Sequence, residues 1–308
     1  MSTDAKPMPE SNLKLPPLPL AQWQATYNTL HMWTQIVGKV RLAQCPAINH
    51  WWGVALYVTA SGLTTSPIPY GHGSFEIQFD FLNHVLLIET SSGEFRELML
   101  ESESVAEFYR KFVAALQNLG IQVHIYTMPQ EFPNPIRFEL DEVHNAYDAE
   151  AVGRFWKILN WSDSVFKEFR ARFIGKVSPI HFFWGSFDLA VTRFSGRPAP
   201  PRPDADPVTA EAYSHEVSSA GFWPGGGGVD GPAYYSYAAP EPAGFGEAKV
   251  KPAAAFYHPT LHEYLLMYDD VRNAPSPEDS LMQFLQSTYE VAANLGRWDR
   301  PALERKTR

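Results

Sequence analysis

The sequence predicts an α+β fold of two tandem, diverged repeats, each an antiparallel sheet flanked by helices, with a pseudo-twofold axis between them. The first reason is length, because 308 residues exceed the usual size of one domain and suit two units of about 150 residues each. The second reason is that short motifs recur in the same order in both halves. The third is that helix-like and strand-like periods alternate along each half.

The repeated motifs mark corresponding places in the two halves. First and second copies are IVGKV at 36–40 and FIGKV at 173–177, HWWG at 50–53 and HFFWG at 181–185, and NLG at 118–120 and 294–296. The first copies are 137 residues apart and the last are 176 apart, so the second half carries a surplus of 39 residues. Most of this surplus lies between Arg197 and Lys251.

Composition and motifs together divide the chain into successive parts. The predicted parts are a disordered tail at 1–19, a first α+β unit at 20–128, a linker at 129–150, and a second α+β unit at 151–304 with a long insertion at 197–251. Repeated prolines prevent a regular start in the tail. Prolines also favour an extended conformation in the linker, which is long enough to cross between units.

The elements of the first unit follow from periodicity. Apolar residues at helical spacing predict a helix over 21–40, with Gly38 as the residue that ends it. Strands are predicted at 51–59 and 63–68, then as an alternating meander at 75–81, 85–90 and 95–100. Ser102 or Ser104 caps a helix over 105–119, and a strand at 121–126 follows.

The second unit repeats this plan with additions. A helix over 155–174 and a strand over 182–194 match the opening of the first unit. The remaining predicted elements are strands at 234–237, 253–257 and 263–268 and a closing helix at 279–294.

Composition excludes several classes of function. The net charge of -9 disfavours nucleic-acid binding, because most of the surface would repel phosphates. The single Cys45 leaves no disulfide and no thiolate zinc cluster, which suits a cytoplasmic protein. No secretory signal and no stretch of about 18 apolar residues is present, so we expect no membrane partner.

Standard catalytic and cofactor motifs are missing. The chain has no Gly-x-Ser-x-Gly and no dinucleotide fingerprint, and Gly225–Gly228 lacks the Lys-Ser/Thr of a phosphate loop, which makes this run a flexible loop. His258 and His262 have the spacing of two metal ligands on a helix, but Pro259 argues for a turn. We therefore expect no cofactor and no metal, and whether the protein is an enzyme stays open.

Long stretches of the chain resemble a known family. Residues 168–176 (EFRARFIGK), 181–196 (HFFWGSFDLAVTRFSG) and 214–227 resemble an uncharacterised bacterial family, the domain of unknown function 5996. Residues 30–39 (LHMWTQIVGK) look like the start of the same family, and the resemblance covers about residues 18–304. It implies a bacterial setting and brings no activity with it.

When the two halves are aligned, a polar residue of the second half matches a small residue of the first. Matching Thr59 to Thr192 places Ala55 on Asp188. Alternation along a strand puts Asp188 and Thr192 on one face and Arg193 on the other. A solvent-facing strand face explains these polar residues, and so does the wall of a pocket.

Three histidines are candidates for proton transfer. His50 and His181 precede the Trp-Gly pairs at corresponding places, so a pseudo-twofold would bring both to the junction between units, where ligand pockets are common. A hydrogen-bonded core histidine is the simpler interpretation of each. His215 and Glu216 lie in the insertion near Trp223, but neighbours in a strand point to opposite faces and would not act as a pair.

The expected function is the binding of a small organic molecule in an aromatic-lined cleft of the second unit, with acid–base transformation as a further step. The ligand would be anionic if Arg193 holds it. Catalytic candidates are His215, Asp188 and His181, and substrate-binding candidates are Arg193, Trp184, Trp223 and His50. The alternative is a non-catalytic scaffold or protein-interaction protein, whose partner the sequence does not identify. A site requires His181, Asp188, Arg193 and His215 to converge within about 8 Å.

Overall fold

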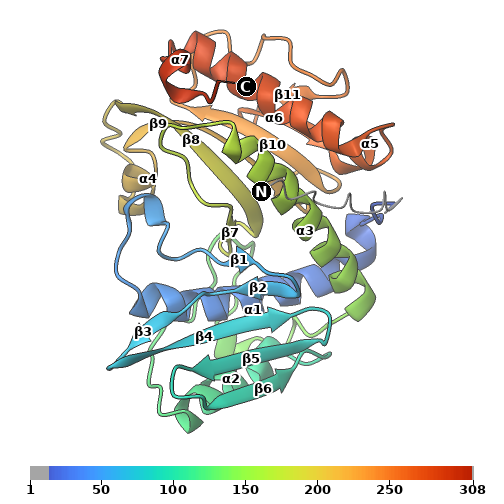
Figure 1. The fold of residues 1–308 in the computed structure, drawn as a ribbon. Helices are drawn as coiled ribbons and strands as arrows, with labels where there is room; N and C mark the ends of the chain where they lie inside the picture. Colours follow the sequence, from blue (N-terminus) through green and yellow to red (C-terminus); the bar gives the residue numbers. More distant parts are fainter. Residues whose placement is uncertain (1–13, 307–308) are drawn as a thin grey trace, which may run out of the picture.

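A computed structural model describes residues 14–306 and has an α+β fold (Figure 1). Within these residues the chain forms two antiparallel sheets of six strands each and seven α-helices. The first half of the chain builds one sheet and the second half builds the other. The predicted α+β class is confirmed, and one sheet per half fits two units. The pseudo-twofold axis stays a prediction.

The first sheet is a meander whose strands alternate in burial. Its strands are β1 Tyr57–Val58, β2 Gly62–Thr64, β3 Ile68–Tyr70, β4 Gly73–Asp80, β5 Val85–Thr90 and β6 Phe95–Met99. Their order is β1-β2-β4-β5-β6, with β3 paired to β4. In β4 the side chains of Phe75, Ile77 and Phe79 are buried, and Ile77 lies opposite Ile88 of β5. The period of two predicted this meander, because alternate side chains point to the same face.

The second sheet includes strands from the predicted insertion. Its strands are β7 His181–Phe183, β8 Asp188–Pro198, β9 His215–Trp223, β10 Ala233–Ala239, β11 Phe256–His258 and β12 Glu263–Met267. Their order is β11-β12-β10-β9-β8-β7. Both β9 and β10 lie within residues 197–251 and occupy central positions. The surplus residues therefore add two strands to the sheet, joined by loops, and are not only a loop.

Helices cover one side of each sheet. The α-helices are α1 Leu20–Gln44, α2 Val105–Asn118, α3 Ala149–Ala171, α4 Pro207–Ala212, α5 Tyr268–Arg272, α6 Pro277–Leu295 and α7 Arg300–Leu303. Short 3₁₀ turns lie at η1 Asn49–Trp51 and η2 Phe138–Leu140. The Ser104 side chain accepts a hydrogen bond from the backbone of Glu107, so Ser104 is the cap of α2.

The helix α1 lies between the two sheets (Figure 1). Every residue from 30 to 41 is buried, which a surface helix would not allow. Gly38 does not end this helix, which continues to Gln44. Its role is close packing, because a Cβ at this position would overlap the indole of Trp184 in the second unit.

Several predicted strands differ in the structure. The run 63–68 is divided between β2 and β3, and only the end of 253–257 belongs to a strand. Residues 182–194 form two strands, because the chain reverses after β7 in a tight turn in which Phe187 has a φ of 58°. Residues 51–56 are mostly turns, so β1 is short. Residues 121–126 belong to no strand. Local alternation predicted each run, but a strand also needs a neighbour to pair with.

The chain segments before α1 and α3 pack against the core. Residues 1–13 of the predicted disordered tail lie outside the described residues, but Leu15 and Leu18 are buried. Order therefore begins before the predicted Leu20. The linker is tied to α1, because the Gln35 amide donates to the carbonyl of Gln130 at 2.8 Å and accepts from its backbone N–H at 2.8 Å.

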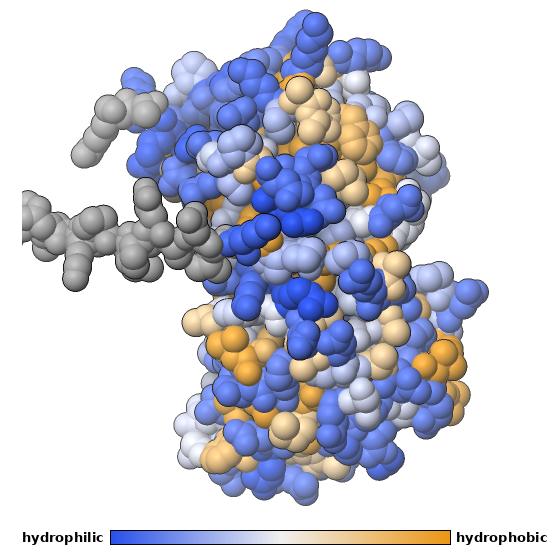
Figure 2. Space-filling model, turned by 90° about the vertical axis from the view of Figure 1, so that its right-hand side faces the viewer, coloured by the Kyte–Doolittle hydropathy of each residue, from blue (hydrophilic) through white to orange (hydrophobic). Residues whose placement is uncertain are grey.

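The two units meet along a seam where an edge of each sheet lies. Leu56, just before β1, and Phe182 of β7 exchange two backbone hydrogen bonds of 2.9 and 2.8 Å. On the side that carries α3 and α5, Figure 2 shows a narrowing between the two lobes and a mostly hydrophilic surface. Further contacts between the units are made by α4 against η1 and by α3 against β1.

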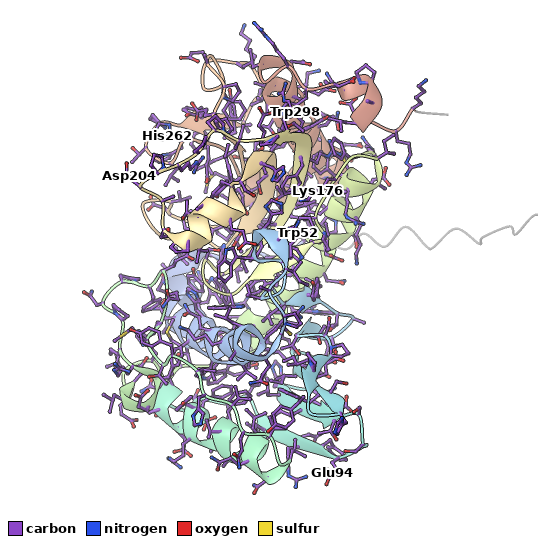
Figure 3. All side chains as sticks on the ribbon, turned by 90° about the vertical axis from the view of Figure 1, so that its left-hand side faces the viewer. Trp52, Glu94, Lys176, Asp204, His262 and Trp298 are labelled. Carbon is purple, nitrogen blue, oxygen red and sulfur yellow. The ribbon has the colours of Figure 1, made fainter. Side chains whose placement is uncertain are left out.

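A lysine of each repeated Gly-Lys-Val motif lies near a tryptophan of the other unit. The ammonium of Lys39 lies 5.9 Å from the ring of Trp184, and that of Lys176 lies 5.3 Å from the ring of Trp52. Figure 3 shows Lys176 and Trp52 side by side where the units meet. Burial lowers the pKa of Lys39 to about 8. The motifs that predicted a repeat are thus contact residues of the seam.

Candidate functional site

The two faces of the second sheet differ in chemistry. One face, which we name the helix face, packs under α3 and α6 with apolar residues such as Leu189, Val191 and Phe222. We name the opposite one the aromatic–acidic face. Its residues are Asp188, Ala190 and Thr192 of β8, Ser219 and Trp223 of β9, Tyr235 and Tyr237 of β10, and Glu263 of β12.

Asp188 lies at the start of β8 on the aromatic–acidic face. It is 7% exposed, and its carboxyl oxygens accept hydrogen bonds from the hydroxyls of Tyr235 and Ser186. Burial raises the pKa of Asp188, although these hydrogen bonds act in the opposite direction. Both donors are neutral, so they do not supply the positive charge that a buried carboxylate lacks.

Two further carboxyl groups lie near Asp188. Burial raises the pKa of Glu263 to about 7, and the charge of Asp188 adds to this rise. The carboxyl of Glu131, from the linker, lies over Gly185, and burial followed by the charge of Asp188 raises its pKa as well. None of the ion pairs within residues 14–306 includes any of these three acids. The negative charge of these three acids is therefore not compensated by an ion pair.

Aromatic rings surround these acids. Tyr235 and Tyr237 stack with ring centroids 6.1 Å apart, and the hydroxyl of Tyr237 lies 2.9 Å from that of Tyr213. Trp223 is half-buried at the end of β9, and the loop Gly225–Gly228 folds against its ring. All four of these glycines have positive φ, so the run is a defined turn that only glycine adopts readily.

His181 lies in β7 on the same face, opposite Ala190 of β8. It is 1% exposed, and neither ring nitrogen has a hydrogen-bond partner. Burial lowers the pKa of His181 to about 3, so its ring is neutral. The surrounding rings are Phe183, Tyr57 and Trp52, with centroids at 5.3, 5.5 and 5.8 Å. His181 is buried as a core histidine would be, but it is not hydrogen-bonded.

His50 and His215 form a separate cluster at the other end of β8. Their ring centroids are 5.5 Å apart. The Nδ1 of His50 lies 3.2 Å from the carbonyl oxygens of Glu211 and Ala212, so it donates, and Nε2 accepts from Lys176 at 2.6 Å. Burial and then the charge of Lys176 lower the pKa of His50. The backbone thus fixes the tautomer of this imidazole.

The predicted partnership of His215 with Asp188 does not fit the geometry. His215 lies opposite Pro198 at one end of β8, whereas Asp188 is the first residue at the other end. His215 and Trp223 bound β9 and are eight residues apart, which is about 26 Å along a strand. His215 therefore cannot share a ligand of ordinary size with Asp188.

The predicted role of Arg193 also needs correction. Arg193 points to the helix face and is 1% exposed. Its guanidinium lies over the rings of Phe169, Tyr289 and Phe173 at 3.4, 4.3 and 5.0 Å, and it donates to the carbonyl of Phe169. Burial lowers the pKa of Arg193 to about 9. It cannot hold an anion beside Asp188, because the sheet separates them.

Trp184 and Trp223 lie in different places. The indole of Trp184 donates to the carbonyl of Val54 at 2.9 Å and packs on Gly38, so it belongs to the seam. Only Trp223 lies on the aromatic–acidic face. The predicted site therefore separates into two parts. Asp188, Trp223 and His181 lie on the aromatic–acidic face, with His181 where that face reaches the seam, and His50 lies with His215 at the other end of β8.

Other parts of the structure bear on the possible kinds of site. A groove of about 480 Å³ lies between α2 and η2, and no predicted site residue lines it. Residues 14–306 contain no three His, Cys, Asp or Glu side chains placed to hold a metal ion. No helix in the same part of the chain has the length and apolarity to cross a membrane.

The fold and the site define an α+β protein with one acidic, aromatic sheet face. The chain belongs to the family described as "Family of unknown function (DUF5996)", whose model matches residues 15–305. The family resemblance expected from the sequence is confirmed over nearly the whole chain. No curated protein and no solved structure matches it.

Three residues of the site escaped the sequence-based prediction. Tyr235 and Glu263 lie on strands that were predicted, but neither burial pattern alternates in a way that would have marked them as site residues. Glu131 carries no signal either, because it comes from the linker and reaches Gly185 only through the tertiary fold.

Proposed function

We propose that the protein binds a small, positively charged organic molecule, such as an amine, on the aromatic–acidic face. The observation that carries this proposal is that Asp188 is buried and Glu263 partly buried on this face, with the exposed Glu131 nearby, and that none of the three forms an ion pair with Lys, Arg or His in residues 14–306. A cationic ligand supplies the charge that these acids lack. The proposal departs from the anionic ligand expected from sequence, because Arg193 lies on the helix face.

The aromatic rings support the same ligand chemistry. An ammonium group is attracted to the face of an indole or phenol ring, most strongly where water is excluded. Trp223 and Tyr237 are half-buried on this face, so part of each residue is open to solvent. A ligand that also has an apolar part would bury that part against them.

Acid–base chemistry on such a ligand would use Asp188 and Glu263. Burial brings the pKa of Glu263 to about 7, where a carboxyl group both gives and takes a proton at neutral pH. The Tyr235 and Ser186 hydroxyls hold the carboxyl of Asp188 in one orientation. His215 takes no part in this step because it lies at the far end of β9.

The test is a thermal-shift and calorimetric titration with ethylamine, benzylamine and choline at constant ionic strength. Ethanol and benzyl alcohol serve as uncharged probes, which should not raise the Tm. Saturating amine is expected to raise the Tm of the wild type by several degrees, because a ligand that binds only the folded state stabilises it. Asp188→Asn and Glu263→Gln should each weaken binding about tenfold or more.

Glu97→Gln is the matched control, because Glu97 is exposed on β6 of the first sheet. It should leave amine binding unchanged. If no amine stabilises the wild type, or if all three variants behave alike, the binding proposal fails. The scaffold interpretation would then be favoured.

A further inference from the structure

Two buried polar side chains at the seam lack hydrogen-bond partners. Both ring nitrogens of His181 and the Nη1 atom of Arg41 are buried and unpartnered. Exposed fractions are 1% for His181 and 7% for Arg41. Buried polar groups in folded proteins are nearly always paired, so an unpaired set at one place points to a missing partner.

The two side chains come from different units but lie against one ring. Arg41 belongs to α1 and His181 to β7, and the ring of Tyr57 from β1 lies 5.2 Å from the guanidinium and 5.5 Å from the imidazole. The Nε of Arg41 donates to the carbonyl of Gly53 at 2.7 Å, which fixes the direction of the guanidinium. The guanidinium of Arg41 is therefore held in one orientation, unlike the mobile side chain of a surface arginine.

The charge at this place is positive and uncompensated. Arg41 takes part in no ion pair within residues 14–306. Arg170 adds a second positive charge near His181, and together with burial the two arginines keep this imidazole neutral. A neutral imidazole still donates one N–H, so it can bind an oxygen acceptor beside a guanidinium.

We propose that the seam binds a small oxyanion, a carboxylate or a phosphate, between Arg41 and His181. The anion would accept from Nη1 of Arg41 and from one N–H of His181, which satisfies the atoms that are now unpaired. Trp52, Tyr57 and Phe183 are each half-buried, so the aromatic wall of this site reaches the surface. The site uses none of the carboxyl groups of the aromatic–acidic face.

The experiment measures Tm in sodium acetate and in inorganic phosphate against sodium chloride of the same ionic strength. The two probes distinguish a carboxylate from a phosphate. One of them should raise the Tm of the wild type by several degrees in a saturable way. With ¹⁵N-labelled histidine, the same anion should shift the ring nitrogen resonances of His181.

His181→Phe is the most informative variant. It replaces the imidazole with an apolar ring in an aromatic setting, so it removes two unpaired nitrogens without opening a cavity. In chloride its Tm should equal or exceed that of the wild type, and stabilisation by the anion should be lost. Arg41→Lys keeps the positive charge but loses the planar guanidinium, which can bind an oxyanion through two N–H groups. The variant should bind the anion about tenfold more weakly.

Arg172→Gln is the control, because Arg172 is exposed on the C-terminal end of α3 and pairs with Glu168 at 3.2 Å. It should keep the full effect of the anion. The proposal would be overturned if the Tm were the same in every salt. It would also be overturned if the anion still raised the Tm of both His181→Phe and Arg41→Lys. An amine effect that persists in His181→Phe tests the aromatic–acidic face separately, so failure of one proposal does not decide the other.

Discussion

Asp188 and Arg193 lie five residues apart on one strand, yet they illustrate opposite uses of a buried charge. Arg193, on the helix face, lies over three aromatic rings and donates to a backbone carbonyl. Asp188, on the aromatic–acidic face, is held only by neutral hydroxyls. Within the described part of the chain, the rings and the carbonyl partly offset the charge of Arg193, whose Nε has no hydrogen-bond partner, whereas no positively charged or aromatic-face contact offsets the charge of Asp188.

The difference separates structural residues from ligand candidates. A charge that the fold already satisfies contributes to stability and has little left to offer a ligand. A charge that the fold leaves uncompensated destabilises the free protein and is available for binding. Substitutions on the helix face should therefore change stability, whereas those on the aromatic–acidic face should change binding and pH dependence.

The largest effect is expected from Arg193→Ala. Removal of the side chain leaves a cavity among Phe169, Phe173 and Tyr289, and should cost about 3–5 kcal/mol of unfolding free energy. Arg193→Met fills most of that space and should cost less than half as much. Denaturant unfolding measures both. A loss of amine affinity in a folded Arg193→Met protein would contradict the separation of the two faces.

A smaller, pH-dependent effect is expected from Glu263→Gln. Because the folded pKa of Glu263 is about 7 and its ordinary value is 4.5, the wild type is most stable below pH 4.5 and loses stability as pH rises to 7. Glutamine removes this loss. The variant should therefore be more stable by about 1–3 kcal/mol at pH 8 and equal at pH 4.

Unfolding curves at pH 4, 6 and 8 measure this effect, with Glu97→Gln as the exposed control. The unfolding free energy of the wild type should fall more steeply between pH 4.5 and 7 than that of Glu263→Gln. Equal slopes would show that the charge of the Glu263 carboxyl is compensated in the folded protein.

The smallest effect is expected from Thr192→Val. The Thr192 hydroxyl lies 2.9 Å from that of Ser219 on the aromatic–acidic face. Removing it should cost about 0.5–1.5 kcal/mol, because one hydrogen bond of ordinary strength is lost. A double-mutant cycle with Ser219→Ala isolates the pair, and additive effects would show that the hydroxyls do not interact.

Much of the fold could be predicted from sequence because it depends on local periodicity. The meander β4 to β6 and the helices α2 and α6 follow from alternation, helical stripes and capping residues. The continuous strand expected over 182–194 failed, because apolar aromatic residues also fill a tight turn. The turn does contain Gly185 and Ser186, which favour turns, but its positive φ falls on Phe187, a residue type that does not indicate one.

The site was harder to predict because it depends on which face of the sheet the helices cover. Asp188 could be proposed, since it replaces an alanine of the first half, and strand alternation already separated it from Arg193. His215 could not be rejected from sequence, because its distance from Asp188 follows from the register of β8 and β9. Arg41 was overlooked because a basic residue near the end of a helix normally faces solvent.

The exchange of backbone hydrogen bonds between Leu56 and Phe182 has a consequence for dissection of the chain. Cleavage in the linker would leave each half with a bare strand edge, and each Gly-Lys-Val motif would lose the tryptophan that it contacts. We therefore expect that neither fragment folds on its own. The two halves are expected to unfold in a single cooperative transition, and coexpressed fragments should recover a native heterodimer only together.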